Sequence, residues 1–214
     1  MNTSYHVGDA AEYVSENRRI FLGLLGIPER QLAIPQQRHT AVVKNISAPG
    51  TYEYCDALMT NVANVYLSVS VADCIPIFIY DVSKKAVACV HAGWRGSEQK
   101  IVEKTLQRMG QVFGTEPDGV LAFIGPAAGK CCYEVGAEVA QKFDDEFIDR
   151  RAGKLYLDLK QVNWQQLRSV GVADSRIERH KDCTICNPAS YHSFRRDRER
   201  SGRMMGIIGL NLQE

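Results

Sequence analysis

The chain has 214 residues, of which 45% are hydrophobic and 24% are charged, a composition typical of one globular domain with a sizeable core. The 26 Lys and Arg residues against 25 Asp and Glu leave a net charge of +1, which excludes an electrostatic footprint for nucleic acid or for an anionic membrane. The apolar run at 20–27 is too short to cross a membrane and no cleavage-like site follows it, so we expect a cytoplasmic protein.

The first half of the chain predicts one helix followed by short strands. Asp9-Ala-Ala-Glu12 resembles a capping box that opens an amphipathic helix, which Gly26 and Pro28 end. Strands are predicted at 41–46, 65–71, 75–80 and 86–90, and the third is apolar enough to be buried on both faces. The expected buried side of the helix consists of Tyr13, Val14, Ile20, Phe21, Leu24 and Leu25.

The second half predicts alternating helices and strands. A loop at 91–96 leads into a helix that starts near Ser97. Further strands are expected at 120–124, 155–159 and 204–210, and further helices at 137–148 and 162–170. No repeat or linker divides the chain, so we predict one domain over residues 1–214. The pattern favours an α+β (mixed α/β) fold, with a core of sandwiched β-sheets flanked by helices.

A thiol and two imidazoles form the candidate site. If strands 75–80 and 86–90 make an antiparallel hairpin, Cys74 at the start of the first lies beside His91 at the end of the second. His39, which precedes strand 41–46, could be a third member if that strand lies next to the hairpin. Two histidines and one cysteine could hold Zn²⁺ or copper with an open position. Without a metal, the same residues would be a Cys–His nucleophile pair, and the alternative for His91 alone is a hydrogen-bonded histidine in a strand-to-helix turn.

Two other motifs give weaker evidence of a functional site. Gly125-Pro-Ala-Ala-Gly-Lys-Cys131 fails as a phosphate loop because it has three residues between the glycines where four are required. Cys183-Thr-Ile-Cys186 is a single CxxC with no partner pair at zinc-finger spacing, so we interpret it as loop thiols that are structural or prone to oxidation. The odd total of seven cysteines agrees with free thiols in a reducing compartment.

Several motifs together resemble those of one known family, and they run in order from about residue 5 to residue 210. They are Gln37-Arg-His39, Asp56-Ala-Leu58, Ala72-Asp-Cys74 with Pro76, His91-Ala-Gly-Trp-Arg-Gly96, Gly125-Pro126, Cys132-Tyr-Glu-Val135, Leu157-Asp-Leu159, Ser193-Phe-Arg-Arg196 and Gly202-Arg-Met204. The chain resembles the YfiH-like, laccase-domain (multicopper polyphenol oxidase-like) family of purine nucleoside phosphorylases, also called the peptidoglycan editing factor family.

The resemblance implies a fold similar to that of cysteine-dependent toxin deamidases and a metal site of His39, Cys74 and His91. It also implies phosphorolysis of adenosine, inosine, guanosine and methylthioadenosine to the base and ribose 1-phosphate, and deamination of adenosine. The alternatives are a copper-dependent polyphenol oxidase, a metal-free cysteine hydrolase or amidase with a role in peptidoglycan editing, and a non-catalytic cell-wall or binding role. The oxidase would need a further histidine cluster, and only His6, His180 and His192 remain.

For the nucleoside enzyme, we expect Arg38 or Arg95 and the Ser97 helix N-terminus to hold phosphate. Asp73 would orient a ligand histidine or contact ribose hydroxyls. The expected metal is Zn²⁺, or alternatively Cu²⁺, and the expected partners are a purine nucleoside and phosphate, with no nucleic acid and no membrane, for a protein that is a monomer.

The chain departs from the family pattern in three places. Thr40 stands where a glycine usually follows the first histidine, and Val71 stands where a threonine usually precedes Ala72-Asp-Cys74. Family members also carry a glycine-rich stretch before the segment that corresponds to 2–9, so we expect this N-terminal segment, and any substrate contact that it makes, to be missing.

Overall fold

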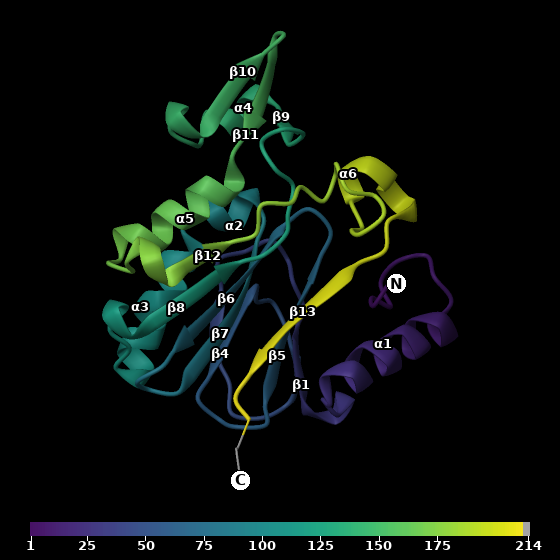
Figure 1. Cartoon of the computed structure of the whole chain (residues 1–214), viewed down its shortest axis with the longest axis vertical. Coiled ribbons are helices and arrows are strands. Elements are labelled where there is room, and N and C mark those ends of the chain that lie inside the picture. Colours follow the sequence, from purple (N-terminus) through teal and green to yellow (C-terminus); the bar gives the residue numbers. More distant parts are fainter. Residues whose placement is uncertain (212–214) are drawn as a thin grey trace.

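A computed structural model describes residues 1–211 (Figure 1). The α-helices are α1 (Ala11–Leu25), α2 (Trp94–Glu98), α3 (Ile101–Phe113), α4 (Ala137–Ala140), α5 (Leu159–Ser169) and α6 (Phe194–Asp197). The strands are β1 (Leu32–Pro35), β2 (Val43–Asn45), β3 (Gly50–Tyr52), β4 (Ala57–Thr60), β5 (Tyr66–Val71), β6 (Ile75–Asp81), β7 (Ala86–Ala92), β8 (Val120–Ile124), β9 (Glu134–Val135), β10 (Ile148–Arg151), β11 (Lys154–Leu157), β12 (Ile177–Arg179) and β13 (Met204–Gly209). Short 3-10 turns are η1 (Glu29–Gln31), η2 (Pro117–Gly119), η3 (Asp145–Phe147), η4 (Asp174–Arg176) and η5 (Arg198–Arg200).

The strands form three sheets. A six-stranded sheet has the order β12-β8-β6-β7-β4-β2, a four-stranded sheet has the order β13-β5-β1-β3, and a smaller one has the order β10-β11-β9. The predicted hairpin is confirmed, because β6 and β7 pair antiparallel with Pro76 opposite His91. β6 lies between β7 and β8 and is largely buried, as its run of apolar residues predicted.

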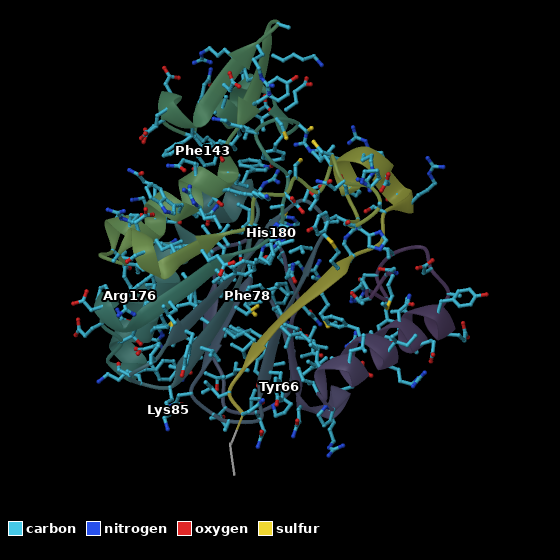
Figure 2. The ribbon with its side chains drawn as sticks, viewed as in Figure 1. Tyr66, Phe78, Lys85, Phe143, Arg176 and His180 are labelled. Atoms are coloured by element: carbon cyan, nitrogen blue, oxygen red, sulfur yellow. The ribbon has the colours of Figure 1, made fainter. Side chains whose placement is uncertain are left out.

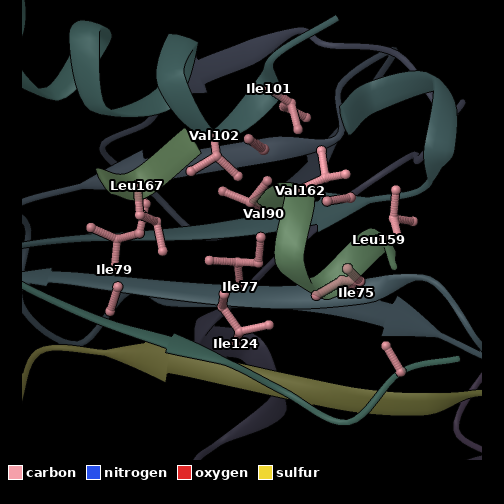
Figure 3. Close-up of a cluster of buried hydrophobic side chains, with 14 of the residues drawn as sticks. Ile75, Ile77, Ile79, Val90, Ile101, Val102, Ile124, Leu159, Val162 and Leu167 are labelled. Carbon is pink, nitrogen blue, oxygen red and sulfur yellow. The ribbon is translucent and has the colours of Figure 1, made fainter. Parts of the chain in front are cut away.

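Alternating side chains on the six-stranded sheet separate two cores. Ile75, Ile77 and Ile79 of β6 pack toward α3 and α5 (Figure 3), whereas Val87 and Cys89 of β7 face the four-stranded sheet. A third cluster joins the outer face of that second sheet to α1. The molecule is therefore layered as α1, four-stranded sheet, six-stranded sheet and helices α3 and α5 (Figure 1), which confirms the predicted mixed α/β sandwich.

The two large sheets approach closely where β13 crosses β6. A Cβ placed on Gly206 of β13 would lie 2.5 Å from Cζ of Phe78, and Figure 2 labels Phe78 beside this strand. Phe78 also stacks on Phe123 of β8, with ring centroids 6.3 Å apart. Gly206 thus leaves room for an aromatic ring between the layers.

The first helix ends at Gly26 as predicted, but its predicted cap and most of its predicted buried face are wrong. α1 begins after Ala10, and the Asp9 carboxylate instead accepts a hydrogen bond of 3.0 Å from Asn2 Nδ2. The buried residues are Val14, Arg18 and Leu22, four residues apart and hence on one helical stripe, while Leu24 is 80% exposed. No helix in residues 1–211 is both long and apolar enough to cross a membrane.

Two predicted helices of the second half are divided or shortened. The helix predicted near Ser97 is two helices, α2 and α3, separated at Lys100, whose φ of 61° is left-handed. The helix predicted over 137–148 stops at Ala140, and the chain continues into the β10–β11 hairpin, which projects at the top of Figure 1. Several other strands of two to four residues are too short to show a periodic pattern, and the sequence pattern did not predict them. They are β1, β3, β4, β9, β10 and β12.

Candidate functional site

The structure brings together the three residues that the sequence nominated. One ligand atom from each of His39, Cys74 and His91, here called the His–Cys–His group, lies within 4.8 Å of the other two. Cys74 Sγ is 3.8 Å from His39 Nε2, and the two imidazole rings meet edge to face with centroids 4.9 Å apart. His91 is buried, whereas His39 is exposed, so the group opens to solvent on the side of His39.

Asp56, directly before β4, positions both histidines. Its Oδ1 accepts hydrogen bonds from His91 Nδ1 at 2.8 Å and from the His39 backbone N–H at 3.0 Å, while its Oδ2 accepts from the N–H groups of Arg38 and Thr40. The loop of His39 therefore reaches the group across β4, which lies between β7 and β2. The expected placement of His39 on a strand adjacent to the hairpin is thus corrected.

Backbone geometry at the group is tight. His39 and Asp73, which flanks Cys74, have left-handed φ values of 57° and 85°, and residues with a Cβ adopt this conformation at a cost of about 1–2 kcal/mol. A Cβ on Gly93 would lie 2.9 Å from His39 Cδ2 and 3.1 Å from Cys74 Sγ. Gly93 thus lets the chain pass close behind two of the ligands.

The charges of the group are coupled. Burial alone would raise the pKa of Cys74, but the charge of His91 and a hydrogen bond from His39 outweigh it and lower the pKa from 9.0 to about 6. Burial likewise opposes the charge of His91, yet Cys74 and Asp56 raise its pKa to about 9. Burial of Asp56 is outweighed by hydrogen bonds from His91 and Thr40, which lower its pKa to about 2. Without a metal, Cys74 and His91 therefore form a thiolate–imidazolium pair over neutral pH.

The donor set fits a metal ion. A thiolate and two imidazoles are ligands that Zn²⁺ and copper accept, and three protein ligands leave a position open. Because His91 Nδ1 faces Asp56, its Nε2 would be the ligand atom, with Asp56 holding the ring as outer-shell carboxylates do. The three side chains thus could hold a metal ion with a position left open.

The predicted substrate-binding residues have different surroundings. Arg38 and Arg95 are exposed and next in sequence to His39 and Trp94; their guanidinium groups lie over the rings of Tyr54 and Trp94. Asp73 is buried, and its carboxylate accepts hydrogen bonds from Thr184 Oγ1 at 2.7 Å and from the Arg195 N–H at 2.6 Å. The carboxylate next to His91 Nδ1 is Asp56, so the expected role of Asp73 in orienting a histidine is wrong, and its contact with ribose hydroxyls stays a prediction.

Ser97 does not begin a helix, which corrects the predicted phosphate site at its N-terminus. It lies inside α2, is 1% exposed, and its hydroxyl accepts a hydrogen bond of 2.8 Å from Asn163 Nδ2 of α5. Its carbonyl accepts from Gln166 Nε2. These contacts turn Ser97 toward α5, so it joins two helices.

The structure also contains a second group of potential metal ligands, which the sequence pattern did not predict. Cys131 and Cys132, between β8 and β9, lie with Cys183 and Cys186, between β12 and α6; these four residues are called the four-cysteine cluster, and their Sγ atoms all lie within 4.8 Å of one another. The adjacent pair Cys131-Cys132 was the signal in the sequence, and its spacing from the CxxC does not follow a zinc-finger pattern. The interpretation of Cys183 and Cys186 as thiols without a partner pair is therefore corrected.

Comparison with known proteins extends over nearly the whole chain. Residues 1–211 match the family model described as multi-copper polyphenol oxidoreductase laccase. The chain is 34% identical over 226 residues to a Bacteroides thetaiotaomicron protein named purine nucleoside phosphorylase, which covers 97% of this chain and 83% of that one. It is 31% identical to Bacillus subtilis purine nucleoside phosphorylase YlmD, over 98% of this chain and 82% of that protein.

Solved structures agree with the fold. The crystal structure of Bacillus licheniformis hypothetical protein YfiH superposes with a TM-score of 0.93 at 31% identity, covering 98% of this chain and 85% of that one. YlmD from Geobacillus stearothermophilus gives the same TM-score at 32% identity, covering 98% and 84%. The chain therefore belongs to the multi-copper polyphenol oxidoreductase laccase family, together with relatives that carry the name purine nucleoside phosphorylase.

Proposed function

We propose that this chain is a purine nucleoside phosphorylase that acts at the His–Cys–His group. The observation that carries the proposal is this group, held by one carboxylate and opening at the exposed His39, in a chain 34% and 31% identical to relatives with that name. The substrates would be adenosine, inosine, guanosine and methylthioadenosine, with phosphate as the second substrate. The protein would act as a monomer in the cytoplasm.

In the proposed reaction, a phosphate oxygen bonds to C1′ of the ribose as the bond from C1′ to the purine nitrogen breaks. The purine leaves with the bonding electrons and takes up a proton, and ribose 1-phosphate remains. The exposed guanidinium groups of Arg38 and Arg95 would bind phosphate, because arginine matches its geometry with two parallel hydrogen bonds. The exposed ring of Tyr54, under Arg38, offers a face for the base.

Zn²⁺ is the metal that we propose for the group, with Cu²⁺ as the alternative. A bound ion would supply positive charge and Lewis-acid chemistry at the open position. Asp56 would keep the imidazole of His91 directed at the ion, and Gly93 would keep the ligands close. The same site would support deamination of adenosine, in which water adds at C6 of the base and ammonia leaves.

A metal-free cysteine hydrolase or amidase is the second candidate, and one observation favours it. Cys74, His91 and Asp56 form a nucleophile, base and orienting carboxylate, with the thiol ionised at neutral pH and His91 Nδ1 2.8 Å from Asp56. An amide in peptidoglycan would then be the type of substrate. Metal content separates this candidate from the first, because a bound ion would occupy the thiolate.

A copper polyphenol oxidase finds less support in the donor set. Four-electron reduction of oxygen by multicopper oxidases needs a histidine-rich cluster beside the copper that cysteine binds. Within the described part of the chain, the other group of potential metal ligands consists of four cysteines. We therefore place the oxidase behind both other candidates.

The test is adenosine turnover with and without phosphate, on protein of determined metal content, with products separated by chromatography. Adenine and ribose 1-phosphate that form only with phosphate would support phosphorolysis, and inosine formed without phosphate would support deamination. His91→Ala should abolish either product, whereas His180→Ala, outside the group, should leave it unchanged. Zinc-loaded, folded protein that turns over no nucleoside would overturn the proposal and favour the cysteine hydrolase.

A further inference from the structure

We propose that the four-cysteine cluster is a second metal site, which holds Zn²⁺ in a structural, tetrahedral tetrathiolate. It is separate from the His–Cys–His group and does not depend on the proposed function. Two loops far apart in the chain supply two sulfur ligands each, and all four sulfur atoms lie within 4.8 Å of one another.

The spacing of the sulfur atoms suits one ion. Cys132 Sγ and Cys131 Sγ lie 3.1 and 3.5 Å from Cys186 Sγ. A Zn–S bond of about 2.3 Å in a tetrahedron puts neighbouring sulfur atoms roughly 3.8 Å apart. Small movements of the exposed Cys131 and Cys186 side chains would reach that spacing.

Backbone contacts hold the two cysteine-bearing loops against each other. Cys183 is buried and forms an isolated parallel bridge with Ala127, and its sulfur accepts a hydrogen bond of 3.2 Å from the Gly129 N–H. A Cβ on Gly129 would lie 3.3 Å from Cys131 Sγ and 3.2 Å from Cys183 Cβ. Backbone N–H groups directed at a cysteine sulfur stabilise its ionised form, and the glycine lets the two loops approach.

Two positive side chains donate hydrogen bonds to backbone carbonyls next to the cluster. Four thiolates and one Zn²⁺ carry a net charge of −2, which needs compensation in a partly buried site. Lys160 Nζ donates to the carbonyls of His180 and Asp182, just before Cys183, at 2.9 and 2.6 Å. Arg151 donates to the carbonyls of Lys130 and Cys131. The same side chains both hold the loops and offset the negative charge.

The cluster is tied to the candidate active site. Thr184, between the two ligands of the CxxC, donates to the Asp73 carboxylate at 2.7 Å, and the Ala128 N–H donates to the Asp73 carbonyl at 3.0 Å. Asp73 directly precedes Cys74. An ion that joins the two loops would therefore fix the backbone that presents the Cys74 thiol.

The experiment measures zinc per chain by mass spectrometry of the metal, in protein purified under reducing conditions. We expect about two ions in the unaltered chain and about one in either of two variants, His91→Ala and the combined Cys131→Ser and Cys186→Ser. Both changed cysteines are exposed, so packing should survive. Cys89→Ala, which changes a core cysteine outside both groups, is the matched control and should keep about two ions.

A second measurement needs no variant. Replacement of zinc by Co²⁺ should give sulfur-to-metal charge-transfer absorption of the intensity of four thiolates, in addition to that of one thiolate at the His–Cys–His group. One zinc per chain that is lost in His91→Ala and kept in the double cysteine variant would overturn the proposal. Absorption with the intensity of a single thiolate, or a disulfide between Cys132 and Cys186 in the reduced preparation, would overturn it as well.

Discussion

Asp56 is the residue on which both histidines of the candidate site depend. It is fully buried and accepts hydrogen bonds from three consecutive backbone N–H groups, of Arg38, His39 and Thr40, as well as from His91. Each partner is a donor, so a carboxylate satisfies them all. An asparagine in its place would direct its NH₂ group toward some of these N–H groups. A donor would then face a donor, and the buried N–H group would lose its acceptor.

We predict that Asp56→Asn weakens metal binding at the His–Cys–His group by about 10–100-fold, because His91 and the loop of His39 lose their common anchor. The loss of stability should be about 3–5 kcal/mol. Competitive titration with a zinc chelator and denaturant unfolding measure the two effects. Asp81→Asn is the control, because Asp81 is an equally buried carboxylate that accepts from the backbone of Ser83 and Lys84. It should cost stability and leave metal affinity unchanged, and equal loss of affinity in both would refute the role of Asp56.

The charge pair at the site makes Cys74 reactive in metal-free protein. The folded pKa of Cys74 is lowered to about 6, so its stabilisation is complete above 9.0 and is lost as pH falls through 6. The folded pKa of His91 is raised to about 9, so its stabilisation is complete below 6.5 and is lost as pH rises through 9. The Cys74 thiolate and the His91 imidazolium therefore coexist between about pH 6 and about pH 9.

We therefore predict that the rate of alkylation of Cys74 by iodoacetamide, followed by mass spectrometry, rises with an apparent pKa near 6. Burial raises the pKa of Cys89 well above 9.0, so that thiol should remain unmodified and serve as an internal reference. His91→Ala should move the midpoint upward. A midpoint near 9.0 in the unaltered chain would contradict the charge pair.

At the scale of elements, the turn from β7 into α2 brings the backbone against the site at Gly93. We predict that Gly93→Ala abolishes metal binding at the His–Cys–His group and lowers the zinc content by about one ion per chain, because its Cβ would lie 2.9 Å from His39 Cδ2 and 3.1 Å from the Cys74 sulfur. The φ of −80° is open to alanine, so the fold should persist. Gly110→Ala in α3, whose Cβ would lie 3.4 Å from the Thr115 carbonyl, is the control and should keep the metal. An unchanged zinc content in both variants would show that the His–Cys–His group tolerates the added Cβ.

The core hairpin could be predicted from the sequence because its two strands are long and close together in the chain. That pairing placed Cys74 beside His91, and the structure confirms it through the Pro76–His91 register. His39 was harder to place, because it approaches across β4, a four-residue strand with a weak pattern. The role of Asp56 was not predicted, since hydrogen bonds to backbone N–H groups leave no periodic signal.

At the scale of the whole molecule, the sequence predicted a sandwich of sheets with helices, but not which strands join which sheet. β5 pairs with β1 and β13, so its partners come from residues 32–35 and 204–209. Contacts at such separations depend on packing between layers, which local periodicity does not report. The four-cysteine cluster was missed for the same reason, because Cys132 and Cys186 are 54 residues apart.

The position of β4 between β7 and β2 has a consequence for the order of folding. Asp56 directly precedes β4, so the ligands can meet only after Ala57 of this strand has paired with Val90 on one side and with Val43 on the other. A metal ion at the His–Cys–His group would then find its ligands only after the barrier to folding has been crossed. The combined Cys131→Ser and Cys186→Ser variant keeps the His–Cys–His group and lacks two thiols of the four-cysteine cluster. In stopped-flow experiments, this variant should refold at the same rate with zinc and with chelator, while zinc should slow its unfolding. Faster refolding with zinc would mean that the ion binds before the rate-limiting step and helps the strands to pair. Equal rates would mean that the ion binds after the sheet has formed and stabilises it.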